Sequence, residues 1–404
     1  MTNIKVHRHW IRRMGLQAAR AAWTFSIGLV MAAAVVLPAT AQTFTPLQEF
    51  KGNPDGAFPR GPLVQDANGN LYGTTTGGGG VSEGTVFKLD TAGHESVLLS
   101  FNNVNGLLPD SGVILDMAGN LYGTADGGPG GAGVLFRLDK NGNATNFHVF
   151  QGGFDSEAGV PAGGVITDEA GNFYGATLAG GLGPFPGFGT VYRVDPTGNF
   201  TVLYKFHGNP DGAGPQGPLV RDADGNLYGA AVEGGTKNKG SIFKIDRNGN
   251  LTVLHNFRGG RDGSGPQGGL LMDNAGNLYG SAIKGGDSSS GTVFEITNIG
   301  RFKRLYSFTG GSDGNSPNGG LVRDPDGNIY GTTQSGPNQD FLGTVFKLSR
   351  TRTLTVLHTF EGLEDGAVPV SGLIRDSAGN LYGTAFKNFL IQPVQGGSVF
   401  KIKP

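Results

Sequence analysis

Five aspartates in glycine-bounded loops are the residues best suited to binding chemistry in this 404-residue sequence. Each is followed by glycine, as in the segment 208–212, and from Asp211 onward they recur every 51 or 52 residues. Carboxylates carried by equivalent loops can form a partial ring that takes a cation or a polar ligand. Asp-Gly is also ordinary turn chemistry, and that alternative stays open. The candidate ligand-binding carboxylates are Asp55, Asp211, Asp262, Asp313 and Asp365.

Three phenylalanines in the most variable loops form a second candidate set. Phe341, Phe386 and Phe389 follow two of the repeated strand segments near the carboxyl end of the chain. Apolar side chains in loops can mark a binding surface, and loops on a rigid scaffold are where function varies. The same residues can instead fold down as a cap over the scaffold, so both interpretations are kept.

The sequence assigns no catalytic residue and no cofactor. It has no cysteine, which excludes disulfides and thiolate chemistry. His148, His255 and His358 each stand two residues before a repeated phenylalanine, where other copies have Tyr204 and Tyr306, so we expect an ordinary strand position. Calcium is the alternative at the segments 222–226 and 324–328, which read Asp-x-Asp-Gly-Asn. The other five copies lack the middle aspartate, which favours a turn, and whether the loop carboxylates hold a cation is left open.

The elements that must position these residues come from a repeat of about 52 residues. The pentad Gly-Asn-(Leu/Phe/Ile)-Tyr-Gly occurs seven times, and three further short blocks recur with it. Each block is rich in β-branched and aromatic residues and is bounded by Gly, Asn, Asp or Pro, which is typical of strands. The pentad tyrosines are Tyr72, Tyr122, Tyr174, Tyr228, Tyr279, Tyr330 and Tyr382.

Four antiparallel strands repeated seven times predict an all-β, seven-bladed β-propeller. The block with the smallest side chains, as in the segment 268–273, suits the innermost strand, and the pentad strand follows it outward. In this register the segment from about Phe44 to Phe50 is a lone outer strand, while the chain ends with three inner strands. We therefore expect the amino-terminal strand to pair into the last blade and close the ring, which removes exposed edges.

Residues 1–41 have the layout of a secretory signal peptide. They contain five Lys or Arg and no acidic residue, then an apolar run from about Phe25 to Pro38, and end in Ala-Thr-Ala. That run is shorter than the ~20 residues of a membrane span. The predicted organisation is thus a signal peptide at 1–41 and a single propeller domain at 42–404. We expect export to the periplasm or the extracellular space, with the general and the twin-arginine routes both open.

The net charge of the predicted domain restricts the classes of partner that it can bind. Five of the 31 basic residues lie in the signal segment, which leaves 26 against 32 acidic residues in the domain. A net acidic chain argues against a nucleic-acid partner, whose binding relies on clustered Lys and Arg. We expect no membrane span after signal cleavage and a monomeric protein.

The recurrent Asp-x-x-Gly-Asn-Leu-Tyr-Gly-Thr, the glycine pairs and the Gly-Thr-Val-Phe-Lys-Leu strand resemble the tandem GloVer repeat of secreted bacterial choice-of-anchor proteins. The resemblance covers residues 42–404 and implies an exported repeat protein without an established reaction. Some members carry a carboxyl-terminal sorting anchor, and no such tail is expected here. The strand order is more loosely similar to NHL and gluconolactonase-like propellers, whose metal ligands find no counterparts in this sequence.

Three functions remain. The first is a secreted binding or interaction scaffold whose ligand is a glycan or another envelope or extracellular protein. The second is a propeller hydrolase or lyase acting on a carbohydrate or lactone, although we expect no enzyme. The third is a structural component of the envelope or matrix. An enzyme should break the sevenfold pattern at the channel mouth, whereas a binder should show an apolar patch there.

Overall fold

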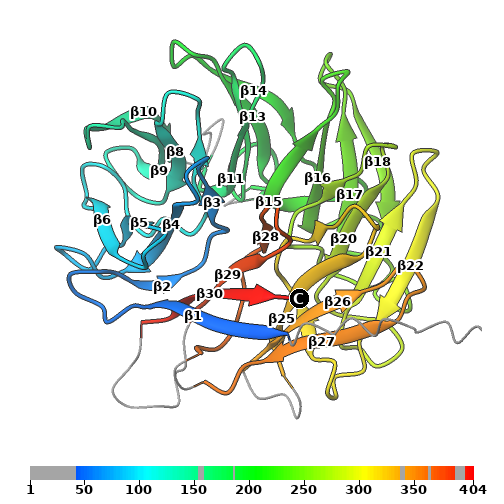
Figure 1. Cartoon of the computed structure of the whole chain (residues 1–404). Coiled ribbons are helices and arrows are strands. Elements are labelled where there is room, and N and C mark those ends of the chain that lie inside the picture. The colour runs from blue at the N-terminus through cyan, green and yellow to red at the C-terminus, as the bar shows by residue number, and fades with distance from the viewer. Residues whose placement is uncertain (1–41, 153–158, 185–186, 337–341, 363–364, 387–395) are drawn as a thin grey trace, which may run out of the picture. The chain divides into compact units, whose positions relative to one another are not determined.

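The computed structural model describes residues 42–404 except 153–158, 185–186, 337–341, 363–364 and 387–395. The described strands form seven antiparallel sheets, and no helix occurs among these residues. The chain is thus the expected all-β propeller with seven blades, and Figure 1 shows the blades in chain order from blue to red. The segment 1–41, expected to be the signal peptide, lies outside the described residues.

The blades are numbered from the first complete sheet. Blade 1 consists of β2 (Ala57–Pro59), β3 (Val64–Gln65), β4 (Leu71–Gly77), β5 (Thr85–Leu89) and β6 (Glu95–Ser100). Blade 2 consists of β7 (Ile114–Leu115), β8 (Leu121–Ala125), β9 (Gly131–Leu138) and β10 (Ala144–Gln151). Blade 3 consists of β11 (Pro161–Thr167), β12 (Phe173–Thr177), β13 (Thr190–Val194) and β14 (Phe200–Lys205).

The remaining blades repeat this order. Blade 4 consists of β15 (Ala213–Arg221), β16 (Leu227–Glu233), β17 (Ser241–Ile245) and β18 (Leu251–Asn256). Blade 5 consists of β19 (Leu271–Met272), β20 (Leu278–Ala282), β21 (Thr292–Ile296) and β22 (Phe302–Ser307). Blade 6 consists of β23 (Asn315–Pro317), β24 (Val322–Arg323), β25 (Ile329–Ser335), β26 (Thr344–Leu348) and β27 (Leu354–Thr359). Blade 7 consists of β28 (Ile374–Arg375), β29 (Leu381–Ala385), β30 (Ser398–Lys403) and β1 (Thr43–Glu49).

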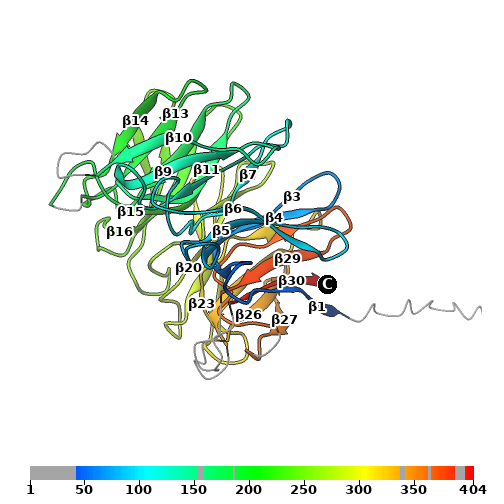
Figure 2. The same ribbon diagram turned by 90° about the vertical axis from the view of Figure 1, so that its left-hand side faces the viewer.

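Ring closure is confirmed, because the amino-terminal strand β1 is the outer strand of blade 7. It pairs antiparallel with β30, from Thr43 opposite Lys403 to Glu49 opposite Ser398. Figures 1 and 2 both show the blue β1 beside the red β30. Phe50, just after β1, is fully buried between blades 7 and 1. The expected order of strands, with the small-residue block innermost, is also confirmed.

The core lies between blades. Seven apolar clusters each join two neighbouring sheets, including the closing pair of blades 7 and 1. The last glycine of the pentad makes this packing possible, since a Cβ on Gly229 would lie 2.5 Å from Cζ of Phe243. Glycine serves the axis in the same way, because a Cβ on Gly61 would collide with the backbone of Gly112 in the next blade. Inner strands therefore approach one another around a narrow channel.

Antiparallel blades give the domain two distinct faces. The turn face carries the Asp-x-x-Gly-Asn turns that join each inner strand to the pentad strand. The loop face carries the loops after the pentad strands and the loops that lead from each outer strand into the next blade. These two kinds of loop touch, as Gly235 N donates to Gly208 O at 2.7 Å and Gly286 N donates to Gly260 O at 2.9 Å.

Candidate functional site

The aspartates of the turn face all have the same partners. In blade 4, Asp222 Oδ1 accepts the backbone N–H of Asn226 at 2.8 Å. Its Oδ2 accepts the Asn226 amide at 2.7 Å and the Tyr228 hydroxyl at 2.9 Å. The tyrosine bond recurs in all seven blades at 2.9–3.2 Å. The carboxylates of these turns are therefore occupied by hydrogen bonds within their own hairpins.

The five candidate aspartates of the loop face also share one arrangement. Each accepts a hydrogen bond from the backbone N–H four residues earlier, at 2.8–3.2 Å, and so closes its own loop. Asp211 and Asp313 are buried, while Asp55, Asp262 and Asp365 are half-buried. No group of three or more His, Asp or Glu with metal-binding geometry occurs among the described residues. Each of the five carboxylates belongs to the loop of a different blade.

Four of these aspartates hold a second partner seven residues earlier on the outer strand. Tyr204 donates to Asp211 at 2.6 Å and Tyr306 donates to Asp313 at 3.0 Å. In the same way, the Nε2 atoms of two histidines contact carboxylates, in the pairs His255–Asp262 at 3.2 Å and His358–Asp365 at 2.9 Å. The interchange of Tyr and His at this strand position is therefore explained by a common acceptor.

The pKa shifts of these side chains agree with a role of the aspartates as hydrogen-bond acceptors within their loops. Burial alone would raise the pKa of Asp365, but hydrogen bonds from His358 and from the backbone N–H groups of Glu361 and Gly362 outweigh it, so the pKa lies below its usual value. Burial lowers the pKa of His255, although Asp262 opposes that shift. Four of the five candidates thus act as paired acceptors that stiffen the loops.

Of the three candidate phenylalanines, the structure places Phe386. Its ring lies 5.4 Å from the ring of Phe58 in blade 1, and the Arg60 guanidinium lies 4.7 Å from its centroid. This is a packed cation–π contact across the seam where the ring closes. Phe341 and Phe389 lie outside the described residues.

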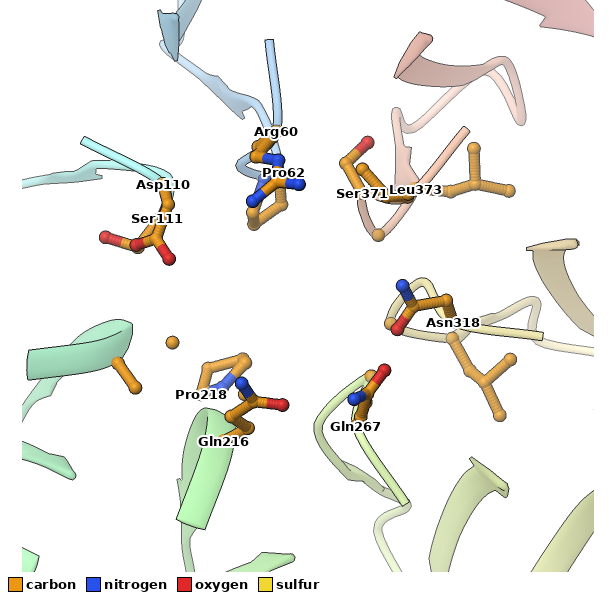
Figure 3. Close-up of a pocket in the computed structure, with 18 of the residues that line it drawn as sticks. Arg60, Pro62, Asp110, Ser111, Gln216, Pro218, Gln267, Asn318, Ser371 and Leu373 are labelled. Atoms are coloured by element: carbon orange, nitrogen blue, oxygen red, sulfur yellow. The ribbon is translucent and has the colours of Figure 1, made fainter. Parts of the chain in front are cut away.

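The mouth of the central channel brings together residues that the sequence analysis did not select. A cavity of about 480 Å³ lies on the axis, lined by inner-strand residues from all seven blades. Figure 3 shows Arg60, Asp110, Gln216, Gln267 and Asn318 around its open centre. They stand where the chain enters each inner strand, which is the end of the channel nearer the loop face. Gln334 of β25 joins the lining.

These five residues occupy one repeated position, directly after a proline that all seven blades share. The proline is constant and the second residue after it is always glycine or serine, but the residue directly after it changes from blade to blade. In blade order the seven residues are Arg60, Asp110, Ala162, Gln216, Gln267, Asn318 and Val370. The symmetry of the ring is therefore broken at its axis. Aligning the seven copies by this proline would have found the set from the sequence.

Amide side chains dominate one side of the mouth. Gln216, Gln267 and Asn318 come from the consecutive blades 4, 5 and 6, and all three are half-buried. None of the three side-chain amides hydrogen-bonds to another of the described residues. Each amide offers both donors and an acceptor, so this side presents unpaired hydrogen-bonding groups to the cavity.

Arg60 and Asp110 occupy the other side, and Asp126 lies outside the lining but close enough to interact with the charge of Asp110. Burial raises the pKa of Asp110, while the charge of Arg60 opposes that shift. Asp126, which follows β8, has its pKa raised to about 7 by burial and by the charge of Asp110. Oδ1 of Asp126 is buried and has no hydrogen-bond partner among the described residues. A carboxyl of this kind can exchange a proton near neutral pH.

One local motif does not make a catalytic site. Residues 310–314 read Gly-Gly-Ser-Asp-Gly and match the Gly-x-Ser-x-Gly pattern of hydrolases. That pattern needs a strand–turn–helix elbow to expose the serine. Here it lies in the loop between β22 and β23, and the aspartate in it, Asp313, accepts bonds from Tyr306 and Thr309.

Family comparison agrees with the repeat geometry. A model of the Gloeobacter/Verrucomicrobia repeat matches residues 26–183, 119–340 and 249–404. The chain belongs to this repeat family. Overlapping matches from residue 26 to the end are what a tandem repeat of seven similar blades produces. No curated protein matches the sequence.

A solved extracellular domain shows the same fold at low sequence identity. The extracellular domain of BT4673 from B. thetaiotaomicron, described as a one component system, is 16% identical with a TM-score of 0.56. The alignment covers 90% of this repeat protein but only 42% of that chain. XC5397 from Xanthomonas campestris, a gluconolactonase, is 13% identical with a TM-score of 0.45, and the alignment covers 89% of each chain. Among the described residues, no helix is long and apolar enough to cross a membrane.

Proposed function

We propose that this protein is an exported binding module that takes a hydroxyl-rich ligand, the end or a branch of a glycan, at the mouth of its central channel. The observation that carries the proposal is the broken symmetry at the position after the shared proline. The pentad and the shared proline change little because they build the ring. A position that lines the cavity and varies among the blades is free to serve a ligand instead.

The chemistry of the mouth supports a polar ligand that is rich in hydroxyl groups. Sugar hydroxyls both donate and accept hydrogen bonds, as do the amides of Gln216, Gln267 and Asn318. Arg60 and Asp110 add one charged donor and one acceptor across the opening. Export is supported by the leader-like composition of residues 1–41. A protein ligand remains the other candidate partner, with the loop face as its contact surface.

A glycan array followed by isothermal titration of the purified protein tests this proposal. The double variant Gln216→Ala/Gln267→Ala should weaken binding of the selected oligosaccharide by about thirtyfold, since two lost hydrogen bonds contribute about 1 kcal/mol each. Asn248→Ala is the matched control, because it removes an exposed amide from a turn on the opposite face. The proposal fails if no glycan binds or if the double variant binds like the wild type.

A second function, hydrolysis or elimination on a carbohydrate or lactone, has one observation in its favour. Asp126, which interacts with Asp110 of the mouth, has a pKa raised to about 7, as a general acid or base would. Turnover of a lactone or an aryl glycoside, lost in Asp126→Asn but retained in Asn248→Ala, would establish this function. Binding without turnover would leave the binding module as the better description.

A further inference from the structure

A cluster of basic side chains lies on the loop face of blades 4 and 5, outside the channel. We call it the basic rim, and it consists of Lys239, Arg258, Arg261, Lys284 and Arg304. From Ala213 to Ser307 the chain has 11 basic and 8 acidic residues, whereas the rest of the domain has 15 basic and 24 acidic residues. Positive charge is therefore concentrated on two neighbouring blades of an otherwise acidic ring.

Contacts between neighbouring segments show that the rim is one surface, built around the loop 258–265. From blade 4, the aliphatic chain of Lys239 crosses this loop, because a Cβ on Gly259 would lie 3.0 Å from it. The Lys239 carbonyl also accepts the N–H of Gly265 at 3.0 Å. From blade 5, Lys284 and Ser264 exchange two backbone hydrogen bonds. The two lysines thus flank the same loop.

The two arginines of blade 5 are fixed by a shared carboxylate. Arg304 Nη2 lies 2.8 Å from Asp287 Oδ2, and Arg261 Nε lies 3.1 Å from Asp287 Oδ1. Arg304 also donates to the Arg261 carbonyl at 3.1 Å. The negative charge of Asp287 offsets one of the two arginine charges. The carboxylate of Asp262 is directed to His255 and to the backbone N–H of Arg258. Lys239, Arg258 and Lys284 are exposed and form no ion pair with another of the described residues.

We propose that the basic rim binds a carboxylated polysaccharide, so that the glycan taken at the channel mouth is an acidic one. This deepens the proposed function and rests on it, because the amides Gln216 and Gln267 come from the same two blades. A chain that enters the mouth and leaves over blades 4 and 5 places its uronate groups on the rim. Lysine and arginine side chains bind such carboxylates by charge-assisted hydrogen bonds.

The surroundings of the rim favour a polysaccharide over other polyanions. A membrane-surface site combines basic residues with inserted apolar side chains. Of the large apolar side chains exposed in the described residues, Ile299 alone belongs to blades 4 and 5, and it lies in the turn between β21 and β22 at the opposite end of blade 5. The others are Val81, Val97, Val104, Leu108, Met117 and Leu182. Single-stranded nucleic acids need exposed aromatic rings for base stacking, whereas the rim has Gly259, Gly260, Ser288 and Ser289 as neighbours.

Binding to polygalacturonate and to its fully methyl-esterified, neutral form tests the proposal at 50 and 300 mM NaCl. The wild type should bind the acidic polymer at least about tenfold more tightly than the neutral one, and added salt should remove most of that difference. The double variant Lys239→Ala/Arg258→Ala should lose about five- to tenfold in affinity for polygalacturonate at low salt. Arg350→Ala/Arg352→Ala, which removes two exposed arginines from the turn face, should bind like the wild type.

Each other outcome overturns a stated part of the proposal. Equal binding of the acidic and neutral polymers, or a rim variant with wild-type affinity, overturns the acidic class but leaves the channel site standing. Tighter binding to phosphatidylglycerol vesicles or to DNA than to polygalacturonate overturns the polysaccharide. Loss of affinity in the rim variant but not in Gln216→Ala/Gln267→Ala upholds the rim and overturns the channel site. Unchanged melting temperatures verify that the variants fold.

Discussion

On the turn face, seven aspartates make the same hydrogen bonds to an asparagine and a tyrosine, at distances that agree within 0.3 Å for the tyrosine. At the channel mouth, seven equivalent positions carry six residue types, from arginine to valine. Both sets belong to the same repeat and lie on or next to the same inner strands. The repeat is therefore constant where it makes hairpins and variable where it meets the axis.

This difference separates stability from recognition. A group whose hydrogen-bonding capacity is filled by its own hairpin contributes to folding, and losing it leaves partners unsatisfied. A side chain that meets only a cavity contributes little to folding and is free to change. The loop aspartates contribute to stability, because each one accepts hydrogen bonds from its own blade.

The largest expected effect on stability comes from opening the ring, on which both the turn face and the channel mouth depend. Deleting residues 42–50 removes β1 together with Phe44, which stacks on His358 at 3.7 Å, and the fully buried Phe50. Loss of one buried phenylalanine costs about 3–5 kcal/mol, so the deletion should remove most of the stability of the domain. Thermal unfolding monitored by circular dichroism measures it. A chain that starts at residue 42 is the control, and equal melting of the two chains would refute ring closure by β1.

The next prediction sets one position from each region against the other. Asp222→Ala leaves Tyr228 and the backbone N–H of Asn226 without their acceptor, so it should lower the free energy of unfolding by about 2–3 kcal/mol. Gln216→Ala at the mouth should change it by less than about 0.5 kcal/mol. Urea denaturation of both variants provides the measurement. Comparable losses would mean that the mouth is as structural as the turns.

The periodicity of the sequence determines which features of the turn face and of the channel mouth could be predicted. The tyrosines of the pentad and the phenylalanine that ends each outer strand are spaced regularly, so blade number, strand order and closure could be inferred from one chain. Asp211 and its equivalents could be located in their loops, but their bonds to Tyr204, His255, Tyr306 and His358 depend on a hairpin geometry that spacing alone does not specify. Arg60 and Gln216 were not selected from the sequence, because only the closed ring brings residues about 150 positions apart to one axis.

The pH dependence of stability should have opposite signs in the two regions. Burial raises the pKa of the turn aspartates, but bonds from Asn and Tyr outweigh it, so the net pKa of Asp222 lies below 3.8. Their contribution is present above that value and is lost as the pH falls through the lower folded pKa. Asp126 behaves in the opposite way, because its folded pKa of about 7 exceeds the unfolded value. Its protonated form is favoured by folding, so stability declines as the pH rises from about 4 to 7.

Asp126→Asn isolates the second of these contributions. The variant should match the wild type near pH 4 and exceed its free energy of unfolding by about 1 kcal/mol at pH 8, after allowance for screening by solvent. Asp110 and Arg60 are the charged groups that couple to this site, and both are unchanged in the variant. Denaturation curves at several pH values provide the test. A gap of the same size at pH 4 and pH 8 would show that folding does not raise the pKa of Asp126.

The smallest expected effect on stability comes from a residue that breaks the sevenfold symmetry in the core instead of at the axis. Tyr192 stands in β13 where the other six blades have phenylalanine. Its side chain is fully buried, burial raises the pKa of its hydroxyl, and that hydroxyl has no hydrogen-bond partner among the described residues. The hydroxyl also lies over Gly175, where the other blades place a bare phenylalanine ring against the pentad glycine.

Tyr192→Phe should therefore raise the free energy of unfolding by about 1 kcal/mol, because it removes a polar group that folding leaves unpaired. Phe243→Tyr, the reverse change at the equivalent position of blade 4, should lower it by a similar amount, since Phe243 is fully buried against Gly229. Urea denaturation of the pair measures both effects in the same background. A destabilised Tyr192→Phe variant would mean that the hydroxyl has a bonding role. Blade 3 would then join the channel mouth as a place where the repeat departs from symmetry for a reason other than packing.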